Sequence, residues 1–251
     1  MKNNTYNPIG FLSGSTIKII ACILMAIDHI GYHLFPDLLI LRIIGRLSMP
    51  LFAFFIAEGC HYTKNKLKHF LLIAISGLLF LLGVKIFAQF WYYNIFLIFA
   101  ISVLYIYLLQ YLKKISLSGN RKILKTIFST VFFLITVFIG YLLYEEVAFE
   151  YGFSVMMLPV LISLVDLKKY IKHPSIKYID NLYTRLLIMA IAMYPTCYDR
   201  AITEIQVYSY FSLIILLFYS GKAGTKKLKY FFYLFYPVHI MLIYAIKFLF
   251  F

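Results

Sequence analysis

The sequence predicts an all-α protein, a polytopic transmembrane helix bundle of about nine spans that forms a single domain over residues 1–251. Three observations support this prediction. Hydrophobic residues make up 63% of the chain. Apolar runs of about 16 to 22 residues recur from end to end, as membrane helices require. The runs show no period-2 alternation, and because lipid leaves only helices or closed barrels as spanning structures, they favour helices.

The expected helices follow the apolar runs in chain order. The first run is too long and too polar for a cleaved signal peptide, so we expect it to be retained as a span. The sixth and seventh runs are short for a hydrocarbon core of ~30 Å, so those helices are expected to be tilted, broken or re-entrant. The nine expected helices cover residues 17–35, 39–59, 69–87, 92–112, 123–143, 152–166, 181–195, 204–220 and 230–250.

The distribution of charge predicts the orientation of the bundle. The net charge is +14, and the basic residues gather in alternate connecting segments, whereas the other segments carry most of the acidic residues. Because positive residues stay on the cytoplasmic side, the N-terminus is expected inside and the C-terminus outside. The lipid bilayer, and not nucleic acid, is then the expected partner of this positive charge. The basic segments contain Lys64–Lys68, Lys113–Lys125 with Arg121, Lys168–Lys177 and Lys222–Lys229; the alternate segments contain Asp37, Glu145, Glu146, Glu150, Asp199, Arg200 and Glu204.

Five ionisable residues lie inside the first two apolar runs, where hydrocarbon should exclude them. They are Asp28, His29, Arg42, Arg46 and Glu58. Burying such a group in a membrane costs several kcal/mol unless it pairs with another group or lines a polar cavity. Each of the five is therefore a candidate functional residue.

Helix geometry predicts which of these groups meet. At 1.5 Å per residue, Asp28, His29 and Arg46 lie at similar depths in two antiparallel helices, so we expect an ion pair between Asp28 and Arg46. His239, in the last span, lies at a comparable depth and meets His29 if the first and last spans pack together. Arg42 is expected to extend outward to the interface.

Special backbone residues flank this group. Gly31 and Gly45 are expected to allow close approach between the first two helices. Pro50 and Pro237 remove helix hydrogen bonds, so each is expected to kink or break its span.

The residue types indicate general acid–base chemistry. A histidine accepts a proton near neutral pH, a neighbouring carboxylate orients its ring, and an arginine binds an anion or a developing oxyanion. No metal site is expected, because the His29–His33 spacing stands without further ligands. A small proton-coupled transporter would also retain buried Asp, His and Arg residues as a relay, and a non-catalytic membrane assembly factor is a third alternative.

Several segments resemble the TraX family, named for the membrane acetyltransferase that modifies the N-terminal amine of conjugative F-type pilin. The similarity follows chain order, and its first two segments are the most specific. It rests on residues 18–31 (K-x-x-A-x-x-L-M-x-x-D-H-I-G), 45–54 (G-R-x-x-x-P-L-F-A-F), Glu58-Gly59 with Thr63, 150–153 (E-Y-G-F), 220–224 (S-G-K-A-G) and 229–239 (K-Y-F-F-Y-L-F-Y-P-V-H).

The resemblance implies an acetyltransferase of the bacterial cytoplasmic membrane, with acetyl-CoA as the donor substrate. His29 would be the general base, oriented by Asp28, and Arg46 would stabilise the oxyanion or hold the donor. The resemblance further implies that Glu58, Thr63, Tyr236 and His239 bind the donor or assist proton transfer. The acceptor is expected to be a pilin-like or other peptide amine, or a hydroxyl group; a glycan and a lipid remain open alternatives.

Overall fold

The computed structural model describes residues 9–88, 94–117, 122–145, 152–198, 204–225 and 227–250. They divide into two compact units, here called unit 1 (Met1–Phe55 and Leu186–Phe251) and unit 2 (Ile56–Arg185). Of the charged residues used above to predict orientation, six lie outside the described residues: Arg121, Glu146, Glu150, Asp199, Arg200 and Lys226.

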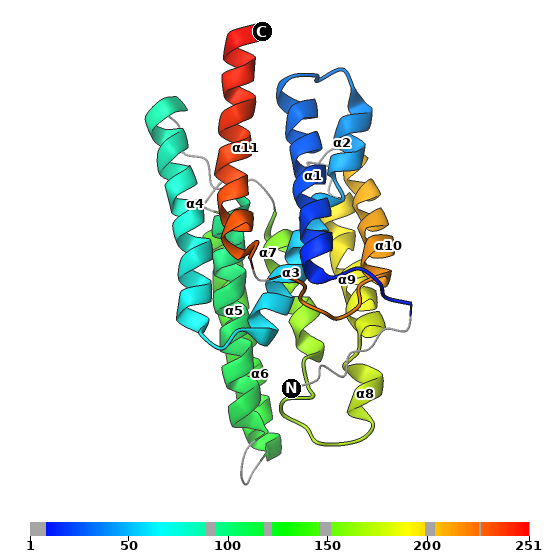
Figure 1. The fold of residues 1–251 in the computed structure, drawn as a ribbon. Helices are drawn as coiled ribbons and strands as arrows, with labels where there is room; N and C mark the ends of the chain where they lie inside the picture. The colour runs from blue at the N-terminus through cyan, green and yellow to red at the C-terminus, as the bar shows by residue number, and fades with distance from the viewer. Residues whose placement is uncertain are drawn as a thin grey trace. The chain divides into compact units, whose positions relative to one another are not determined.

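Unit 1 is built mainly from α1, α2 and α11 together with a 3₁₀ helix that continues into a short α-helix (Figure 1). The bounds are α1 (Gly14–His33), α2 (Leu39–Gly45), η2 (Glu204–Phe211), α10 (Ser212–Leu217) and α11 (Lys229–Phe250). Helix α1 packs against both α2 and α11, and η2 packs against α2 and α10. The boundary between the units falls within α3 (Ser48–Tyr62) and α9 (Leu182–Tyr198).

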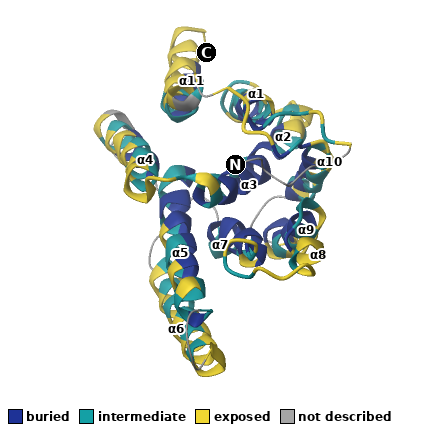
Figure 2. Cartoon of the chain, turned by 60° about the horizontal axis from the view of Figure 1, so that its bottom comes forward, coloured by how far each residue is buried: buried dark blue, intermediate teal, exposed yellow. Residues whose placement is uncertain are grey.

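Unit 2 is arranged around α5 (Ile95–Ser116), which packs against α4 (Lys66–Ala88), α6 (Lys122–Glu145) and α7 (Phe153–Ile162). The unit also contains the 3₁₀ helix η1 (Ser163–Val165) and the short α8 (Ile176–Ile179). Figure 2 shows buried residues along α5 and α7, whereas exposed residues cover much of α4 and α6. Their exposed apolar side chains are those expected of helices that face lipid.

The prediction of an all-helical membrane bundle is confirmed in its main feature. Six helical stretches in the described residues are long and apolar enough to cross a membrane, and they correspond to the first five expected spans and the last one. The other three expected spans coincide with shorter helical segments: α7 with η1, α9, and η2 with α10. The count of nine spans and the orientation of the termini stay predictions.

The second expected span is two helices and not one. Helix α2 ends at Gly45 and α3 begins at Ser48, with a turn at residues 46–47 between them. Pro50 has no backbone N–H, so it cannot donate to the carbonyl of Arg46 as a residue four positions later does in an α-helix. The hydroxyl of Ser209 donates to this carbonyl instead, at 3.1 Å. Pro237, in contrast, lies inside a continuous α11.

Two glycines let α1 and α2 pack closely, as expected. A Cβ atom placed on Gly45 would lie 2.2 Å from Cβ and 2.6 Å from Cα of Asp28. A Cβ atom on Gly31 would lie 2.7 Å from Cβ of Leu41. The absence of these side chains therefore brings α2 against α1 beside Asp28.

The N-terminus of α1 is hydrogen-bonded to the loop between α10 and α11. Leu12 forms a parallel bridge with Tyr219, and the backbone N–H groups of Gly14 and Ser15 donate to the carbonyls of Lys222 and Ala223. Gly224 adopts φ +80° within this loop, a conformation that favours glycine. The first N–H groups of α1 thus have protein partners.

We predict that Gly45→Ala strongly destabilises the protein, because the new methyl group meets the backbone of Asp28 and the helices must separate. Overpacking of this kind costs about 1–3 kcal/mol or more. Thermal unfolding in detergent measures the effect. Gly152→Ala is the matched control, since its nearest neighbour to a new Cβ is the Ser154 hydroxyl at 3.6 Å. Equal melting temperatures for the two variants would contradict the packing account.

Candidate functional site

The carboxylate of Asp28 binds two arginines in unit 1. Its Oδ2 lies 3.0 Å from NH1 of Arg42, and its Oδ1 lies 3.4 Å from NH2 of Arg46. Arg42 also donates to the backbone carbonyl of Asp28 at 3.2 Å. Asp28 and Arg46 are buried, with 6% and 8% of their surfaces exposed. One carboxylate between two guanidinium groups leaves this group with an excess positive charge.

His29 and His239 form a hydrogen-bonded pair between α1 and α11. Nδ1 of His29 lies 2.7 Å from Nε2 of His239, and the two rings stack with centroids 4.9 Å apart. Nδ1 of His239 lies 2.7 Å from the carbonyl oxygen of Phe235, which only accepts. Nδ1 of His239 must therefore carry a proton, and in the neutral ring its Nε2 accepts from Nδ1 of His29.

This chain of bonds fixes the tautomer of His29. With its proton on Nδ1, the neutral imidazole presents Nε2 as an unprotonated nitrogen. The ring of His29 is half-buried, whereas His239 is 7% exposed. Tyr236, 2% exposed, packs its ring edge-on to both histidines, at centroid distances of 6.3 and 5.7 Å. The arrangement holds a base at a fixed place and leaves its reactive nitrogen available.

The side chain and backbone of Arg46 are held by η2. NH1 of Arg46 donates to Oε1 of Gln206 at 3.3 Å, and Nε2 of Gln206 donates to the hydroxyl of Ser209 at 2.7 Å. That hydroxyl donates to the carbonyl of Arg46, which Pro50 leaves without its helical donor. Nε of Arg46 is buried and makes no hydrogen bond within the described residues.

Unit 2 contains a second buried charge cluster, which we call the Arg185 cluster: Arg185, Glu58, Asp166 and Asp180. NH1 of Arg185 binds Oε1 of Glu58, and NH2 binds Oδ1 of Asp166 at 2.5 Å and Oδ1 of Asp180 at 3.1 Å. All four residues are buried. The cluster joins α3 and α9 residues to the segment that follows η1.

Further contacts complete the Arg185 cluster. Nδ1 of His61 lies 3.0 Å from Oδ2 of Asp166. The ammonium of Lys113 donates at 2.8 Å to the carbonyls of Ser163 and Leu164, at the end of η1. Burial alone would raise the pKa of Asp166, but the contact with His61 and the charge of Arg185 outweigh it, so the pKa lies below its ordinary value of 3.8.

The structure brings together most of the residues that the sequence singled out. Asp28, His29, Arg46, Tyr236 and His239 lie in unit 1, and the expected Asp28–Arg46 and His29–His239 contacts are present. The remaining two candidates lie in unit 2.

Glu58 binds Arg185, and Thr63 donates its hydroxyl to the carbonyl of Asn65 at 3.2 Å, just before α4 begins. Their assignment to donor binding stays a prediction. So do the roles of the unit 1 residues.

Two expectations about side chains were wrong. Arg42 does not extend outward alone: it binds Asp28, and its guanidinium lies 4.7 Å from the ring centroid of Tyr32. The ring of His29 is held by His239 and not by Asp28, whose carboxylate is directed to the two arginines.

Sequence reasoning missed five of the residues described above. Gln206 and Ser209 lie three residues apart, a spacing that places them directly above one another in a 3₁₀ helix. The others are Asp166, Asp180 and Arg185. An arginine inside an apolar run, as in α9, was a signal of a buried partner.

The unit 1 group has components that acyl transfer requires: a base with a fixed tautomer, a buried cation in the same unit, and an N–H donor that has no hydrogen-bond partner among the described residues. Within the described residues no three His, Cys, Asp or Glu side chains lie close enough together to hold a metal ion.

Comparison with known proteins identifies a protein family that the chain matches. Residues 13–247 match the family model described as TraX protein. The uncharacterized protein RP591 of Rickettsia prowazekii (strain Madrid E) is 41% identical over 92 residues, which cover 36% of this chain and 35% of the length of that relative. No solved structure matches the chain.

We predict that Arg185→Met destabilises the protein by about 3–5 kcal/mol, because it leaves three buried carboxylates without their common cation. Denaturant titration in detergent micelles measures the loss. Lys177→Met is the control, since Lys177 is exposed and contacts the ring of the adjacent Tyr178, and it should change stability by less than about 0.5 kcal/mol. A loss for Arg185→Met no larger than that of the control would show that the cluster is not stabilising.

The Arg185 cluster also predicts a pH dependence. Because the pKa of Asp166 is lower in the folded than in the unfolded chain, its stabilisation is fully present above the unfolded value of about 4 and is lost as pH falls through the folded value. Melting temperatures measured from pH 6 down to pH 3 should therefore fall less steeply for Asp166→Asn than for the natural chain. Parallel curves would exclude Asp166 as a contributor.

Proposed function

The chain belongs to the TraX family, and on this premise we propose that it is a membrane-embedded acyltransferase. It moves an acetyl group from cytoplasmic acetyl-CoA to an amine or hydroxyl acceptor. One observation carries the proposal: the His29–His239 pair leaves Nε2 of His29 unprotonated, in the same unit as the Asp28–Arg46 ion pair.

The proposed reaction uses His29 as general base. Nε2 of His29 takes the proton of the acceptor amine or hydroxyl as the acceptor attacks the thioester carbonyl of acetyl-CoA. A new bond from nitrogen or oxygen to the acetyl carbon forms, the carbon–sulfur bond breaks, and the proton passes to the coenzyme A thiolate. His239, which accepts from Nδ1 of His29, spreads the positive charge that develops on the ring.

Arg46 is the proposed stabiliser of the negative charge on the thioester oxygen. A preorganised cation in a water-excluded site stabilises a developing oxyanion far more than it would in water. Nε of Arg46 is buried without a hydrogen-bond partner among the described residues, so it supplies an N–H group for that oxygen. The carboxylate of Asp28 lies 3.4 Å from NH2 of the same guanidinium and balances part of its charge.

The donor is proposed to approach along the N-terminal part of α1. The ammonium of Lys18 lies 5.1 Å from the ring centroid of Phe55 and 5.7 Å from that of Phe232. It precedes His29 by ~16 Å along the helix at 1.5 Å per residue. Lys18 and the exposed Lys222 are cations suited to the phosphates of acetyl-CoA, with the pantetheine arm extending toward His29.

The proposed acceptor is a pilin-like or other peptide amine, by analogy with the enzyme that gives the family its name, or a hydroxyl of a glycan or lipid. Amine and hydroxyl acceptors use the same base and differ only in the bond formed. The proposed location is the bacterial cytoplasmic membrane, where the donor is available from the cytoplasm.

We predict that His29→Ala lowers kcat for acetyl transfer by about 10²- to 10⁴-fold, the range for loss of a general base, without loss of acetyl-CoA binding. Purified protein in lipid nanodiscs with radiolabelled acetyl-CoA and a mixed extract of cell-envelope acceptors measures transfer, and titration calorimetry measures binding. His33→Ala, one turn along the same helix, is the matched control and should retain most activity.

Full transfer by His29→Ala would refute the base assignment. Proton-coupled uptake of a solute into vesicles by the natural chain, with no acetylated product, would refute the transferase and support the transporter alternative.

A further inference from the structure

Helix η2 is an unusually long 3₁₀ helix with three distinct faces. It extends over eight residues, Glu204–Phe211, whereas 3₁₀ runs longer than three or four residues are uncommon. Because a 3₁₀ helix has 3.0 residues per turn, residues three apart lie directly above one another. Each face of η2 therefore repeats every third residue.

The buried face of η2 is polar. Gln206 and Ser209, together with Ser212 at the start of α10, are each 0% exposed. Three polar side chains at a spacing of three would diverge along an α-helix, but the 3₁₀ geometry of η2 directs Gln206 and Ser209 to one side. Burying polar groups in an apolar protein is unfavourable unless they form hydrogen bonds. Gln206 and Ser209 are therefore expected to have hydrogen-bond partners.

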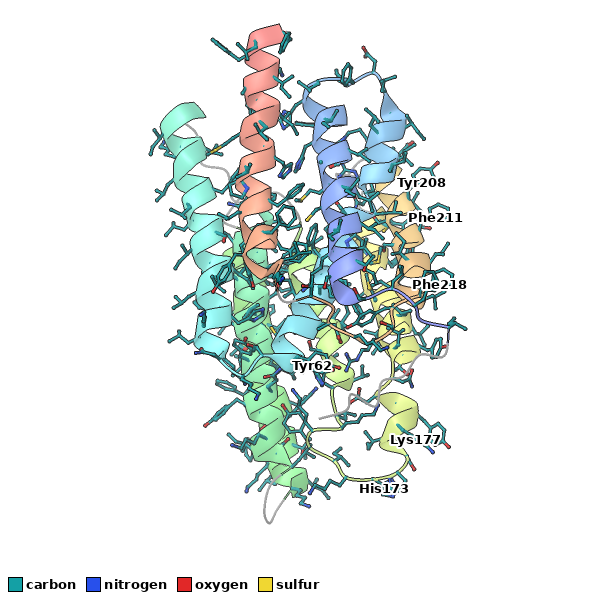
Figure 3. The ribbon with its side chains drawn as sticks, viewed as in Figure 1. Tyr62, His173, Lys177, Tyr208, Phe211 and Phe218 are labelled. Carbon is teal, nitrogen blue, oxygen red and sulfur yellow. The ribbon has the colours of Figure 1, made fainter. Side chains whose placement is uncertain are left out.

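The opposite face of η2 is aromatic and exposed. Tyr208 and Phe211 stack with ring centroids 6.3 Å apart and an interplanar angle of 16°. Figure 3 labels these two rings and Phe218, which project from η2 and from the end of α10 at the surface of the protein. The exposed aromatic face suits a lipid environment and fixes the polar face toward the interior of unit 1.

The polar face forms a closed hydrogen-bonded ring with a single arginine. Arg46 donates from NH1 to Gln206, Gln206 donates to Ser209, and Ser209 donates to the carbonyl of Arg46. Each donor in this ring has one acceptor, and the ring begins and ends on the same residue. It thus fixes both the backbone and the side chain of Arg46.

Two features of the chain around Arg46 make this ring necessary. Pro50 leaves the Arg46 carbonyl without a helical donor, so the hydroxyl of Ser209 satisfies a carbonyl that would otherwise be buried unpaired. The turn at residues 46–47 also removes the helical constraint on Arg46, so its guanidinium depends on side-chain partners for its direction. Asp28 supplies one of these partners and Gln206 the other.

We infer that Gln206 and Ser209 are positioning residues for acyl transfer, which act by aiming Nε of Arg46 at the thioester oxygen. This inference rests on the proposed role of Arg46 in transition-state stabilisation. A donor that binds the oxyanion raises kcat only if it is held in place before the reaction. Loss of the ring lets the guanidinium rotate, and a displacement of about 1 Å in such a site reduces the rate by about 10²-fold.

The chain provides a matched control for this inference. Ser212 lies on the same helical segment, is equally buried, and its hydroxyl has no hydrogen-bond partner among the described residues. Ser212→Ala removes a buried hydroxyl group, as Ser209→Ala does, but it leaves the hydrogen-bonded ring intact. A difference between these two variants therefore reports the ring and not the removal of a buried hydroxyl.

The experiment compares Gln206→Leu, Ser209→Ala, Ser209→Thr and Ser212→Ala in nanodiscs, with kcat and the KM for acetyl-CoA measured separately. We expect kcat to fall about 10- to 100-fold in Gln206→Leu and Ser209→Ala, with KM changed less than about threefold, because the ring acts in the transition state. Ser209→Thr keeps the hydroxyl and should restore most of kcat. Ser212→Ala should behave as the natural chain.

The outcomes separate the two proposals. If the natural chain transfers acetyl groups and Ser209→Ala keeps the kcat of Ser212→Ala, the positioning inference is overturned while the proposed function stands. If the natural chain transfers no acetyl group, both fall. A parallel fall in kcat and melting temperature that Ser209→Thr does not rescue would show a purely structural role and would also overturn the inference.

Discussion

The structure depends on the cost of placing charge inside an apolar helix bundle. A carboxylate or guanidinium taken out of water requires a partner that recovers most of its lost solvation. Each unit meets this requirement with one shared centre: Asp28 binds two arginines in unit 1, and Arg185 binds three carboxylates in unit 2. Within the described residues, Nε of Arg46 and Nε of Arg185 have no hydrogen-bond partner, and the pairing with His239 leaves Nε2 of His29 unprotonated. The proposed chemistry requires the two groups of unit 1, Nε of Arg46 and Nε2 of His29.

Backbone features that break regular helix structure place these groups. Gly45 brings α2 against α1 at the level of Asp28, so the ion pair forms at close range. The turn at residues 46–47 separates α2 from α3, and Pro50 leaves the carbonyl of Arg46 for Ser209. Such interruptions are tolerated in a membrane protein where other side chains satisfy the freed backbone groups. The site of unit 1 is thus built where helix α2 ends, and not on the uninterrupted face of a helix.

Much of this arrangement was predictable from the sequence, and the failures have physical causes. The depth of Asp28 and Arg46 follows from the fixed rise of a helix, so their pairing was predicted and is present. Arg42 was misplaced because a long flexible side chain reaches either an interface or a neighbouring carboxylate, and sequence spacing does not distinguish the two. Gln206 and Ser209 were missed because they are uncharged, whereas the residues singled out inside the apolar runs were ionisable. The Arg185 cluster was missed because the path of the segment from Asp166 to Asp180 is set by tertiary contacts.

The tautomer of His29 is the most direct test of the central claim, that the described geometry prepares a base at Nε2. Solid-state ¹⁵N NMR of histidine-labelled protein in bilayers at neutral pH distinguishes protonated from unprotonated ring nitrogens, and His29→Ala and His239→Ala assign the signals. The account predicts that both neutral rings carry the proton on Nδ1, and that the Nε2 signal of His239 shifts when His29 is removed. A proton on Nε2 of His29, or a His239 signal that does not respond to His29→Ala, would contradict it.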